Sequence, residues 1–185
     1  EEIFKMKFDV IVGNPPYQLS DGGFGKSASP LYHKFVEQAK KLNPRFLTMI
    51  IPARWFAGGK GLKDFRGEML NDSQIREIVD FENASECFPG VDIAGGICYF
   101  LWEKGSGGHC EVRNIQNGVE VRSTRALNEF STFVRHGKAV PIIRKVLANK
   151  ENKMNEQVSA SKPFGLRTFV RPQKIGDLLR SAIPF

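Results

Sequence analysis

The sequence is poor in the residue types that bind metals and form disulfides. Its 185 residues include three histidines and three cysteines. Cys87, Cys98 and Cys110 have no Cys-x-x-Cys spacing, so they indicate reduced thiols of a cytoplasmic protein rather than a disulfide framework. The histidines do not cluster either, which argues against zinc, and no metal site is predicted.

Long apolar runs are also lacking. No stretch of about eighteen apolar residues is present, so we expect no membrane span and no membrane partner. The first residues are acidic and contain no signal-peptide core. The apolar fraction of 41% is enough for a packed core, and the length suits one domain, alone or with a small appendage. The net charge of +7 favours an anionic partner, with nucleic acid as the first candidate.

Strand and helix patterns alternate over the first hundred residues. Apolar runs predict strands at Phe8–Val12, Phe46–Ile51, Ile75–Phe81 and Gly96–Trp102, and helical spacing predicts helices at Leu31–Leu42 and Leu62–Leu70. The first run is continuously apolar, as expected of a strand that is covered on both faces. The last strand is the one for which we expect an antiparallel partner. This alternation predicts an α/β fold with right-handed crossovers.

The pattern changes after residue 103. Two alternating segments, His109–Ile115 and Val119–Ser123, flank Asn117-Gly118, which is a strong hairpin signal. A helix is predicted over Val140–Ala148 and a mobile polar loop over Asn149–Lys162. Basic residues recur through this part of the chain: Arg113, Arg122, Arg125, Arg167, Arg171, Lys174 and Arg180. We therefore expect two regions, 1–103 and a basic C-terminal extension over 104–185.

The most informative segment is Asn14-Pro15-Pro16-Tyr17, which directly follows the first predicted strand. The two prolines fix φ and remove two backbone donors, so the Asn14 amide and the carbonyls of Asn14 and Pro15 remain as acceptors. These acceptors suit a planar amino group, and Tyr17 can lie against a flat ring beside it. Ligands of such sheets bind at the carboxyl ends of strands. The segment therefore predicts a site for the exocyclic amine of a nucleobase.

The run Phe-Asp-Val-Ile-Val-Gly-Asn-Pro-Pro-Tyr at residues 8–17 closely resembles the catalytic motif of amino-group methyltransferases that use S-adenosylmethionine. In N6-adenine DNA methyltransferases the motif reads Asn/Asp-Pro-Pro-aromatic. The resemblance implies that Asn14, Pro15, Pro16 and Tyr17 are catalytic, and that gripping the amine hydrogens favours a tetrahedral nitrogen able to attack the methyl group. Positioning and fixed dipoles then supply most of the rate. The same motif occurs in enzymes that methylate RNA bases or a protein glutamine, so these alternatives stay open.

A second resemblance lies in Glu86–Ile93, which precedes the apolar run Gly96–Leu101. In DNA adenine methyltransferases with this motif order, a Phe-Pro turn precedes a strand, and its Phe stacks on the target base after the base has left the helix. Phe88 matches that position, which implies that Tyr17 and Phe88 clamp the adenine. Stacking on an aromatic side chain contributes roughly 1–3 kcal/mol per base and offsets part of the cost of unstacking. The alternative reading of Phe88 is a core residue at a turn.

Together, residues 8–103 resemble the catalytic half of the adenine methylase domain of type IIG restriction–modification enzymes. The resemblance implies the C-terminal half of a Rossmann-like class I methyltransferase sheet, with a small α+β appendage. The S-adenosylmethionine-binding elements normally precede the motif, and the thirteen residues before Asn14 contain neither of them. The glycine clusters at 21–25 and 105–108 lack strand–loop–helix context. Cofactor-binding residues are therefore not assigned, and we expect part of a larger enzyme that is inactive alone, or a catalytically inert DNA-binding fragment.

The implied partners are double-stranded DNA and the remainder of the parent methyltransferase, with a fused nuclease as an open option. Candidate DNA contacts are Lys26 and Lys60, in glycine-rich loops near the predicted active face, and Arg54, after the second strand. Arg54 either contacts DNA or cofactor, or pairs with a carboxylate. The resemblance implies that the extension over 104–185 begins a target-recognition region. Its basic residues can neutralise phosphates as a group, although each one alone suits an ordinary solvated surface.

Overall fold

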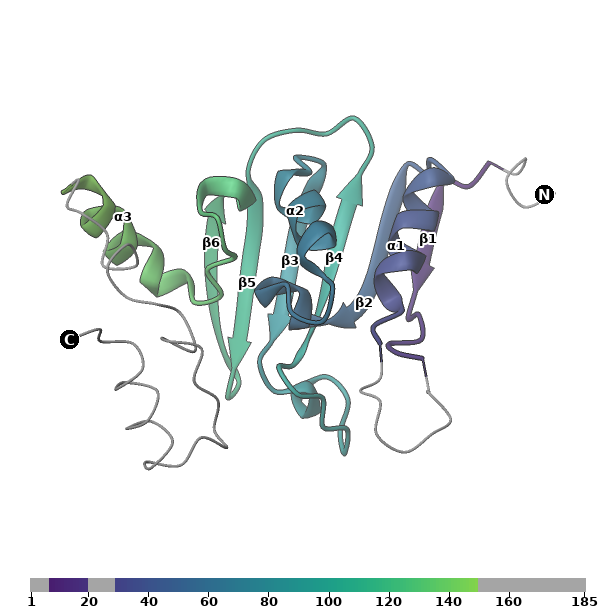
Figure 1. Ribbon diagram of the computed structural model, residues 1–185, viewed down its shortest axis with the longest axis horizontal. Coiled ribbons are helices and arrows are strands. Elements are labelled where there is room, and N and C mark those ends of the chain that lie inside the picture. Colours follow the sequence, from purple (N-terminus) through teal and green to yellow (C-terminus); the bar gives the residue numbers. More distant parts are fainter. Residues whose placement is uncertain (1–6, 20–28, 150–185) are drawn as a thin grey trace, which may run out of the picture. The chain divides into compact units, whose positions relative to one another are not determined.

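The computed structural model describes residues 7–19 and 29–149. The chain divides into two compact units, Glu1–Ile142 and Ile143–Phe185. The six strands of the described residues lie in the first unit (Figure 1): β1 Val10–Gly13, β2 Phe46–Pro52, β3 Ile75–Phe81, β4 Ile97–Glu103, β5 Cys110–Gln116 and β6 Val119–Arg125. The helices are α1 Tyr32–Lys41, α2 Lys63–Asn71 and α3 Val140–Ala148, with 3₁₀ turns η2 Ala53–Ala57, η3 Ala84–Glu86, η4 Leu127–Glu129 and η5 Gly137–Ala139. None of the described helices is long and apolar enough to cross a membrane.

The strands form one mixed sheet in the order β1-β2-β4-β3-β5-β6. β1 pairs with β2 in parallel, and β3 pairs with β5 in parallel. β4 lies between β2 and β3 and runs antiparallel to both, which confirms the expected antiparallel partner. Because β4 reverses direction, the carboxyl ends of β1, β2, β3 and β5 all lie along one edge of the sheet, the lower edge in Figure 1, here called the carboxyl edge.

The predicted strands and helices are confirmed with small shifts of their ends, and β3 and α3 have the predicted bounds. The expectation that the first strand is covered on both faces is wrong for the described part of the chain. Val10 is 53% exposed and Val12 is 74% exposed. β1 is the edge strand of the described sheet, and its other face, with Ile11, packs against the core. The apolar run therefore forms a strand of which one face is open.

The predicted hairpin is also confirmed, because β5 and β6 pair antiparallel around Asn117-Gly118. Both turn residues have positive φ, 51° and 72°, as a two-residue type I′ turn requires. β5 joins β3 directly, so the sheet continues past residue 103, where we expect the basic extension to begin. The role of that extension stays a prediction. Most of the expected polar loop over 149–162, and the basic tail after it, lie outside the described residues.

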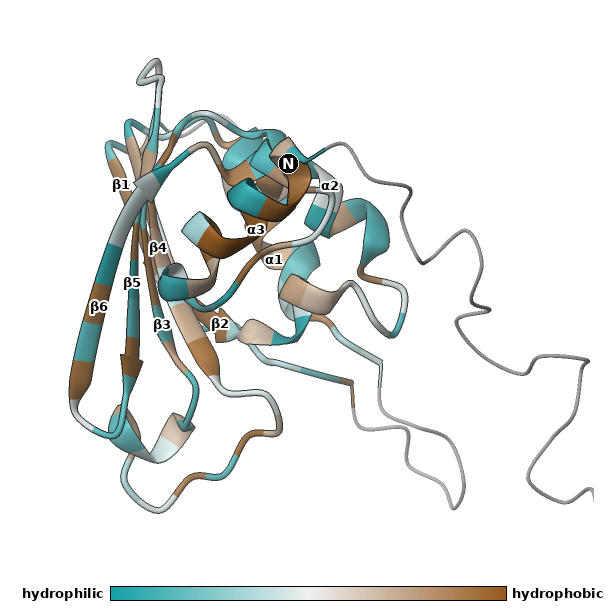
Figure 2. Ribbon diagram, turned by 90° about the vertical axis from the view of Figure 1, so that its left-hand side faces the viewer, coloured by the Kyte–Doolittle hydropathy of each residue, from teal (hydrophilic) through white to brown (hydrophobic). Residues whose placement is uncertain are grey.

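The core lies between the sheet and the two helices α1 and α2, which cover the same face (Figure 2). Trp55 and Phe100 are fully buried there, and the Trp55 indole donates to Cys98 Sγ at 3.4 Å. The three cysteines are free thiols, as predicted. Burial raises the pKa of all three thiols, that of Cys110 to about 12, so they stay protonated and poorly nucleophilic.

Gly96, the residue before β4, makes close backbone contacts with the residues at the ends of β2 and β3 on the carboxyl edge. Its φ is +77°, and a Cβ at this position would lie 2.1 Å from the carbonyl oxygen of Phe81. Its own carbonyl accepts a hydrogen bond from the Ala53 amide at 3.0 Å. The residues that follow β2 and β3 therefore meet the entry to β4 through backbone contacts that only glycine permits.

Asp72 links three elements at the opposite edge of the sheet. Its Oδ2 accepts from Lys40 Nζ of α1 at 2.6 Å and from Trp102 Nε1 of β4 at 2.9 Å, and its Oδ1 accepts from the Gln74 amide at 3.0 Å. Burial alone would raise the pKa of Asp72, but the Lys40 ammonium and the two neutral donors together lower it. The ionised carboxylate is therefore the form that stabilises the fold.

We expect Asp72→Asn to cost about 2 kcal/mol of unfolding free energy, because hydrogen bonds to a charged group are lost. A lowered pKa means that this contribution is complete above the ordinary Asp pKa of about 3.9 and is lost as the pH falls through the folded-state value. Urea unfolding at several pH values should show a difference between wild type and variant that shrinks on acidification. Asp64→Asn, at an exposed position of α2, is the matched control. A difference independent of pH would contradict this role.

Candidate active site

The Asn14–Tyr17 segment leaves β1 at the carboxyl edge, as the sequence predicts. Asn14 and Pro16 are exposed, Pro15 is buried, and Tyr17 is half-buried. The Tyr17 carbonyl accepts from the Leu31 amide at 3.0 Å, just before α1 begins, and the Leu19 amide donates to the Ser29 carbonyl at 3.0 Å. The chain after the motif is thus tied to the start of α1. Asn14 is presented to solvent at the end of the strand instead of turning into the core.

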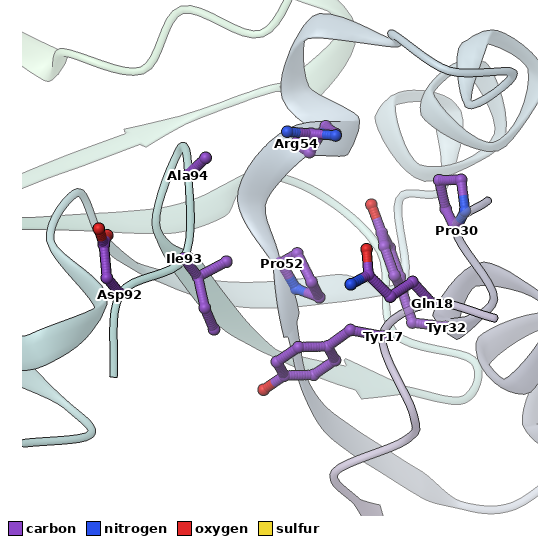
Figure 3. Close-up of a pocket in the computed structure, with 9 residues that line it drawn as sticks. All are labelled: Tyr17, Gln18, Pro30, Tyr32, Pro52, Arg54, Asp92, Ile93 and Ala94. Atoms are coloured by element: carbon purple, nitrogen blue, oxygen red, sulfur yellow. The ribbon is translucent and has the colours of Figure 1, made fainter. Parts of the chain in front are cut away.

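A cavity of about 240 Å³ lies beside this segment (Figure 3). Its walls come from three places on the carboxyl edge: the motif segment, the end of β2, and the loop that precedes β4. The lining residues are Tyr17, Gln18, Pro30, Tyr32, Pro52, Arg54, Asp92, Ile93 and Ala94. Complete small-molecule sites span about 300–1,000 Å³, so this cavity suits a group the size of one ring rather than a whole nucleotide.

Tyr17 connects the motif to the loops on the other side of the cavity. Figure 3 shows its ring extending from the motif segment toward the loop that carries Ile93. Burial, and then the neighbouring thiols of Cys87 and Cys98, raise the pKa of Tyr17. Its hydroxyl oxygen is shielded from solvent and has no hydrogen-bond partner among the described residues. The ring is therefore placed by packing, and Cys87, the residue before Phe88, is one of its neighbours.

Phe88 follows η3 in the turn between β3 and β4, on the same carboxyl edge as Asn14. It is half-buried, and its amide donates to the Ala84 carbonyl at 2.8 Å. Neither Phe88 nor Asn14 lines the cavity that Tyr17 shares with Arg54. The topology thus brings the segments that carry Asn14, Tyr17 and Phe88 to one edge, and the clamping of a base between Tyr17 and Phe88 stays a prediction.

The three candidate DNA contacts fall in different surroundings. Arg54, in η2, faces the Tyr17 cavity and also a shallow apolar groove next to it, and no ion pair joins it to a described carboxylate. Lys60 is exposed in the loop before α2, with a φ of 54°. Lys26 lies outside the described residues. Arg54 is therefore the candidate that the structure brings next to the motif.

The arginines of the β5–β6 hairpin are engaged within the chain. Arg113 pairs with Glu77 at 2.9 Å and with Glu120 at 2.8 Å. Arg122 also contacts Glu120 and lies 3.6 Å from Glu111. Arg125 is only 3% exposed, donates to the Val134 carbonyl, and lies over the Phe133 ring. These contacts neutralise the described hairpin internally, so it makes a poor phosphate-binding surface.

Two glycine-rich stretches of the described residues differ from a nucleotide-binding loop. Residues 105–108 join β4 to β5 and precede no helix. Gly58–Gly61 does precede α2, but it follows a 3₁₀ turn instead of a strand. The guanidinium of Arg66 occupies the space beside it: it lies 3.0 Å from where a Gly58 Cβ would stand, and it donates a hydrogen bond to the Ala57 carbonyl. Neither stretch has the strand–loop–helix context that a nucleotide cradle needs.

Sequence reasoning missed several residues of this edge. Gln18, Pro30 and Tyr32 line the cavity because the motif segment pairs with the residues before α1, which no local pattern announces. Asp92–Ala94 complete the opposite wall. The sequence contains a partial indication of this wall, because the resemblance around Phe88-Pro89 extends over Asp92 and Ile93. The contacts of Glu86 and Arg135, described below, had no sequence signal.

The chain is similar to known restriction-modification proteins. Residues 1–88 match the sequence profile of the Eco57I restriction-modification methylase family. The chain is 45% identical over 101 residues to an uncharacterized adenine-specific methylase of Mycoplasma pneumoniae, a match that covers 53% of this chain and 24% of that protein. It superposes on the type IIG restriction endonuclease BpuSI with a TM-score of 0.53 and 16% identity, covering all of this chain and 29% of that one.

These matches have different weight. The chain spans about a quarter of the length of its curated relative. The low identity to BpuSI shows the fold alone, which agrees with the predicted α/β, Rossmann-like class. The family match covers the motif and the Phe88 position. Residues 1–88, a little less than half of the chain, are therefore similar to the Eco57I family of restriction-modification methylases.

Proposed function

We propose that this chain forms the substrate-amine side of a DNA adenine methyltransferase, which transfers a methyl group from S-adenosylmethionine to the exocyclic nitrogen of an adenine that has left the double helix. The observation that carries the proposal is the exposed Asn14 at the carboxyl end of β1, followed by the buried Pro15 and by Tyr17 at a ring-sized cavity. Substrates of such sheets bind at this edge.

The proposed reaction needs no strong general base from the chain. The lone pair of the adenine amine is delocalised into the ring, so the nitrogen is a weak nucleophile. The Asn14 side-chain oxygen and a motif carbonyl accept the two amine hydrogens, which favours a tetrahedral nitrogen with an available lone pair. S-adenosylmethionine would supply the methyl group: the nitrogen lone pair forms the new N–C bond, the electrons of the broken C–S bond stay on S-adenosylhomocysteine as it leaves, and the surplus proton of the nitrogen passes to solvent. These fixed acceptors lower the barrier through preorganised dipoles rather than through a strong base.

The aromatic residues hold the base in place. The Tyr17 ring lies at the cavity and is positioned by packing, and Phe88 is carried by the neighbouring turn. A base stacked on both rings keeps its amine within reach of Asn14. Arg54, at the same cavity, is suited to a phosphate of the extruded nucleotide or of its neighbours. The proposal also includes double-stranded DNA and the rest of the parent enzyme as partners.

A methylation assay on the parent enzyme tests this function. Tritiated S-adenosylmethionine is supplied with duplex DNA, with RNA, or with a glutamine-bearing protein substrate, and the labelled product is digested to locate the methyl group. We expect label on N6 of adenine in DNA. Label only in RNA or only in protein would refute DNA as the substrate, and no label in any arm would refute the methyltransferase assignment.

Tyr17→Phe is expected to keep the rate of the parent enzyme within about threefold of wild type, because stacking uses the ring face. The Tyr17 hydroxyl has no partner among the described residues, so its removal breaks no described hydrogen bond. Tyr17→Ala removes the ring and is expected to lower kcat/KM by about 10–100-fold, the equivalent of roughly 1–3 kcal/mol of stacking. Steady-state kinetics on duplex DNA checks both variants. Equal rates for the Phe and Ala variants would contradict the stacking role.

A further inference from the structure

A single carboxylate joins the Phe88 turn to the tip of the β5–β6 hairpin. Glu86 Oε1 accepts a hydrogen bond from the Asn117 amide at 3.0 Å, and Glu86 Oε2 accepts one from the Gly118 amide at 3.0 Å. The two donors are consecutive residues of the type I′ turn, so both amides are presented to the same carboxylate. Charge-assisted bonds of this kind are stronger than neutral ones.

The Glu86 contact lies in the turn between β3 and β4. The other side-chain hydrogen bonds that the described residues make in this turn are at its beginning, just after β3. Glu82 accepts from Gln116 Nε2 at 2.8 Å, which anchors the residues just after β3. Asn83 caps η3 by accepting from the Ser85 amide at 3.0 Å. The Phe88 amide then bonds back to the Ala84 carbonyl at 2.8 Å. Glu86 is two residues before Phe88, so its clamp fixes the part of the turn that carries the ring.

We propose that Glu86 is a positioning residue, which holds Phe88 in place for the target base by clamping its turn to the hairpin tip. This role rests on the proposed function, since it concerns the placement of the proposed stacking residue. In this role Glu86 itself touches neither the base nor the cofactor. It acts through a turn whose continuation, Asp92–Ala94, also forms one wall of the Tyr17 cavity. The hairpin thereby serves the active site as a support, although it lies 31 residues away in sequence.

The first test compares Glu86→Ala with Glu86→Gln and with Glu68→Ala, an exposed carboxylate of α2, in the parent enzyme. We expect Glu86→Ala to lower kcat about tenfold, because a small displacement of a positioned group is costly, while the Kd for DNA stays within about twofold. Glu86→Gln keeps an acceptor for one amide and should fall between. An adenine analogue whose fluorescence depends on stacking, placed at the target base, should report altered stacking in Glu86→Ala only.

The second test is a double-mutant cycle with Phe88→Ala. If Glu86 acts through Phe88, the double variant is no slower than Phe88→Ala alone. Hydrogen exchange of the Asn117 and Gly118 amides, measured in the same proteins, should be faster in Glu86→Ala than in wild type. Independent, multiplying effects on kcat, or unchanged exchange, would overturn the positioning role.

The outcomes separate this role from the proposed function. A wild-type parent enzyme that methylates no DNA adenine overturns both. An active parent enzyme in which Glu86→Ala folds and works like Glu68→Ala overturns the role of Glu86 alone. Thermal unfolding of each variant guards against global loss of structure, and Glu86→Gln supplies the kinetic comparison if the alanine variant does not fold.

Discussion

Replacing Asn14 with alanine is expected to lower kcat of the parent enzyme by about 10³-fold, the effect of deleting a preorganised group that stabilises the transition state. The side chain lies at the exposed end of β1, so its loss should change the free energy of unfolding by less than about 0.5 kcal/mol. Binding of DNA should be nearly unchanged, because one amide at the strand end contributes little to an interface dominated by phosphate contacts. The effect is thus expected in kcat rather than in Kd.

Asn14→Asp is the informative companion variant. A carboxylate at this position still offers oxygen acceptors to the amine hydrogens, and the resembling motif accepts Asp here. We expect this variant to retain at least about tenfold more activity than Asn14→Ala, because its acceptors remain preorganised at the strand end. Single-turnover methylation of a duplex with one target adenine measures both. An Asn14→Ala rate within tenfold of wild type would rule out amine activation by this residue.

Local patterns predicted most of the described fold. β3, α3 and the hairpin follow from hydrophobic period and turn chemistry, which operate over a few residues. The antiparallel β4 was anticipated as well. The open face of β1 was not, because an apolar run specifies a strand but not what covers it. Burial depends on neighbours in space, and the described part of the chain supplies them on one face only.

The candidate site, like the fold, was predictable where the signal is local in the sequence. The motif placed Asn14 and Tyr17 at a strand end, and the topology confirms that strand end. The position of Arg54 after the second strand predicts a contact with DNA or cofactor, or a pairing with a carboxylate, and the side chain lines the Tyr17 cavity. The Glu86 clamp and the ion pair of Arg135 could not be foreseen. They join residues 31 to 55 positions apart, and no spacing rule links a carboxylate to amides or arginines at such a separation.

The ion pair between Arg135 and Asp80 stabilises the carboxyl edge of the sheet, which carries the candidate site. Asp80, in β3, is fully buried, and its two carboxylate oxygens accept from Arg135 Nε and from an Arg135 terminal nitrogen at 2.6 Å each. Asn114 Nδ2 donates to the same carboxylate at 2.8 Å. Arg135 belongs to the segment after β6 that also packs Phe133 against Phe56, with ring centroids 4.1 Å apart. One guanidinium therefore both neutralises a buried charge and fastens this segment to the sheet.

Arg135→Leu is expected to destabilise the chain by about 3–5 kcal/mol, because it leaves the Asp80 carboxylate buried without its counter-charge. Urea unfolding of the chain measures this. Arg122→Leu is the matched control: its side chain is 63% exposed, and surface pairs contribute only about 0–1 kcal/mol. The double variant Asp80→Leu/Arg135→Leu removes both charges and should be more stable than Arg135→Leu. A loss below about 1 kcal/mol for Arg135→Leu would contradict the assigned role.

The stability difference between wild type and Arg135→Leu should also depend on pH, which gives a second test of this prediction. Burial raises the pKa of Asp80 even with Arg135 present, and removal of the guanidinium must raise it further. A raised folded-state pKa favours the protonated form, so its stabilising contribution is complete at low pH and is lost as the pH rises through that value. The stability difference between wild type and Arg135→Leu should therefore be smaller in acid than at neutral pH. The difference for Asp72→Asn also shrinks on acidification, but for another reason. At Asp72, acid removes the advantage of the wild type by protonating a carboxylate that Lys40 stabilises as an anion, whereas at Asp80 acid stabilises the Arg135→Leu variant by neutralising its unpaired buried charge.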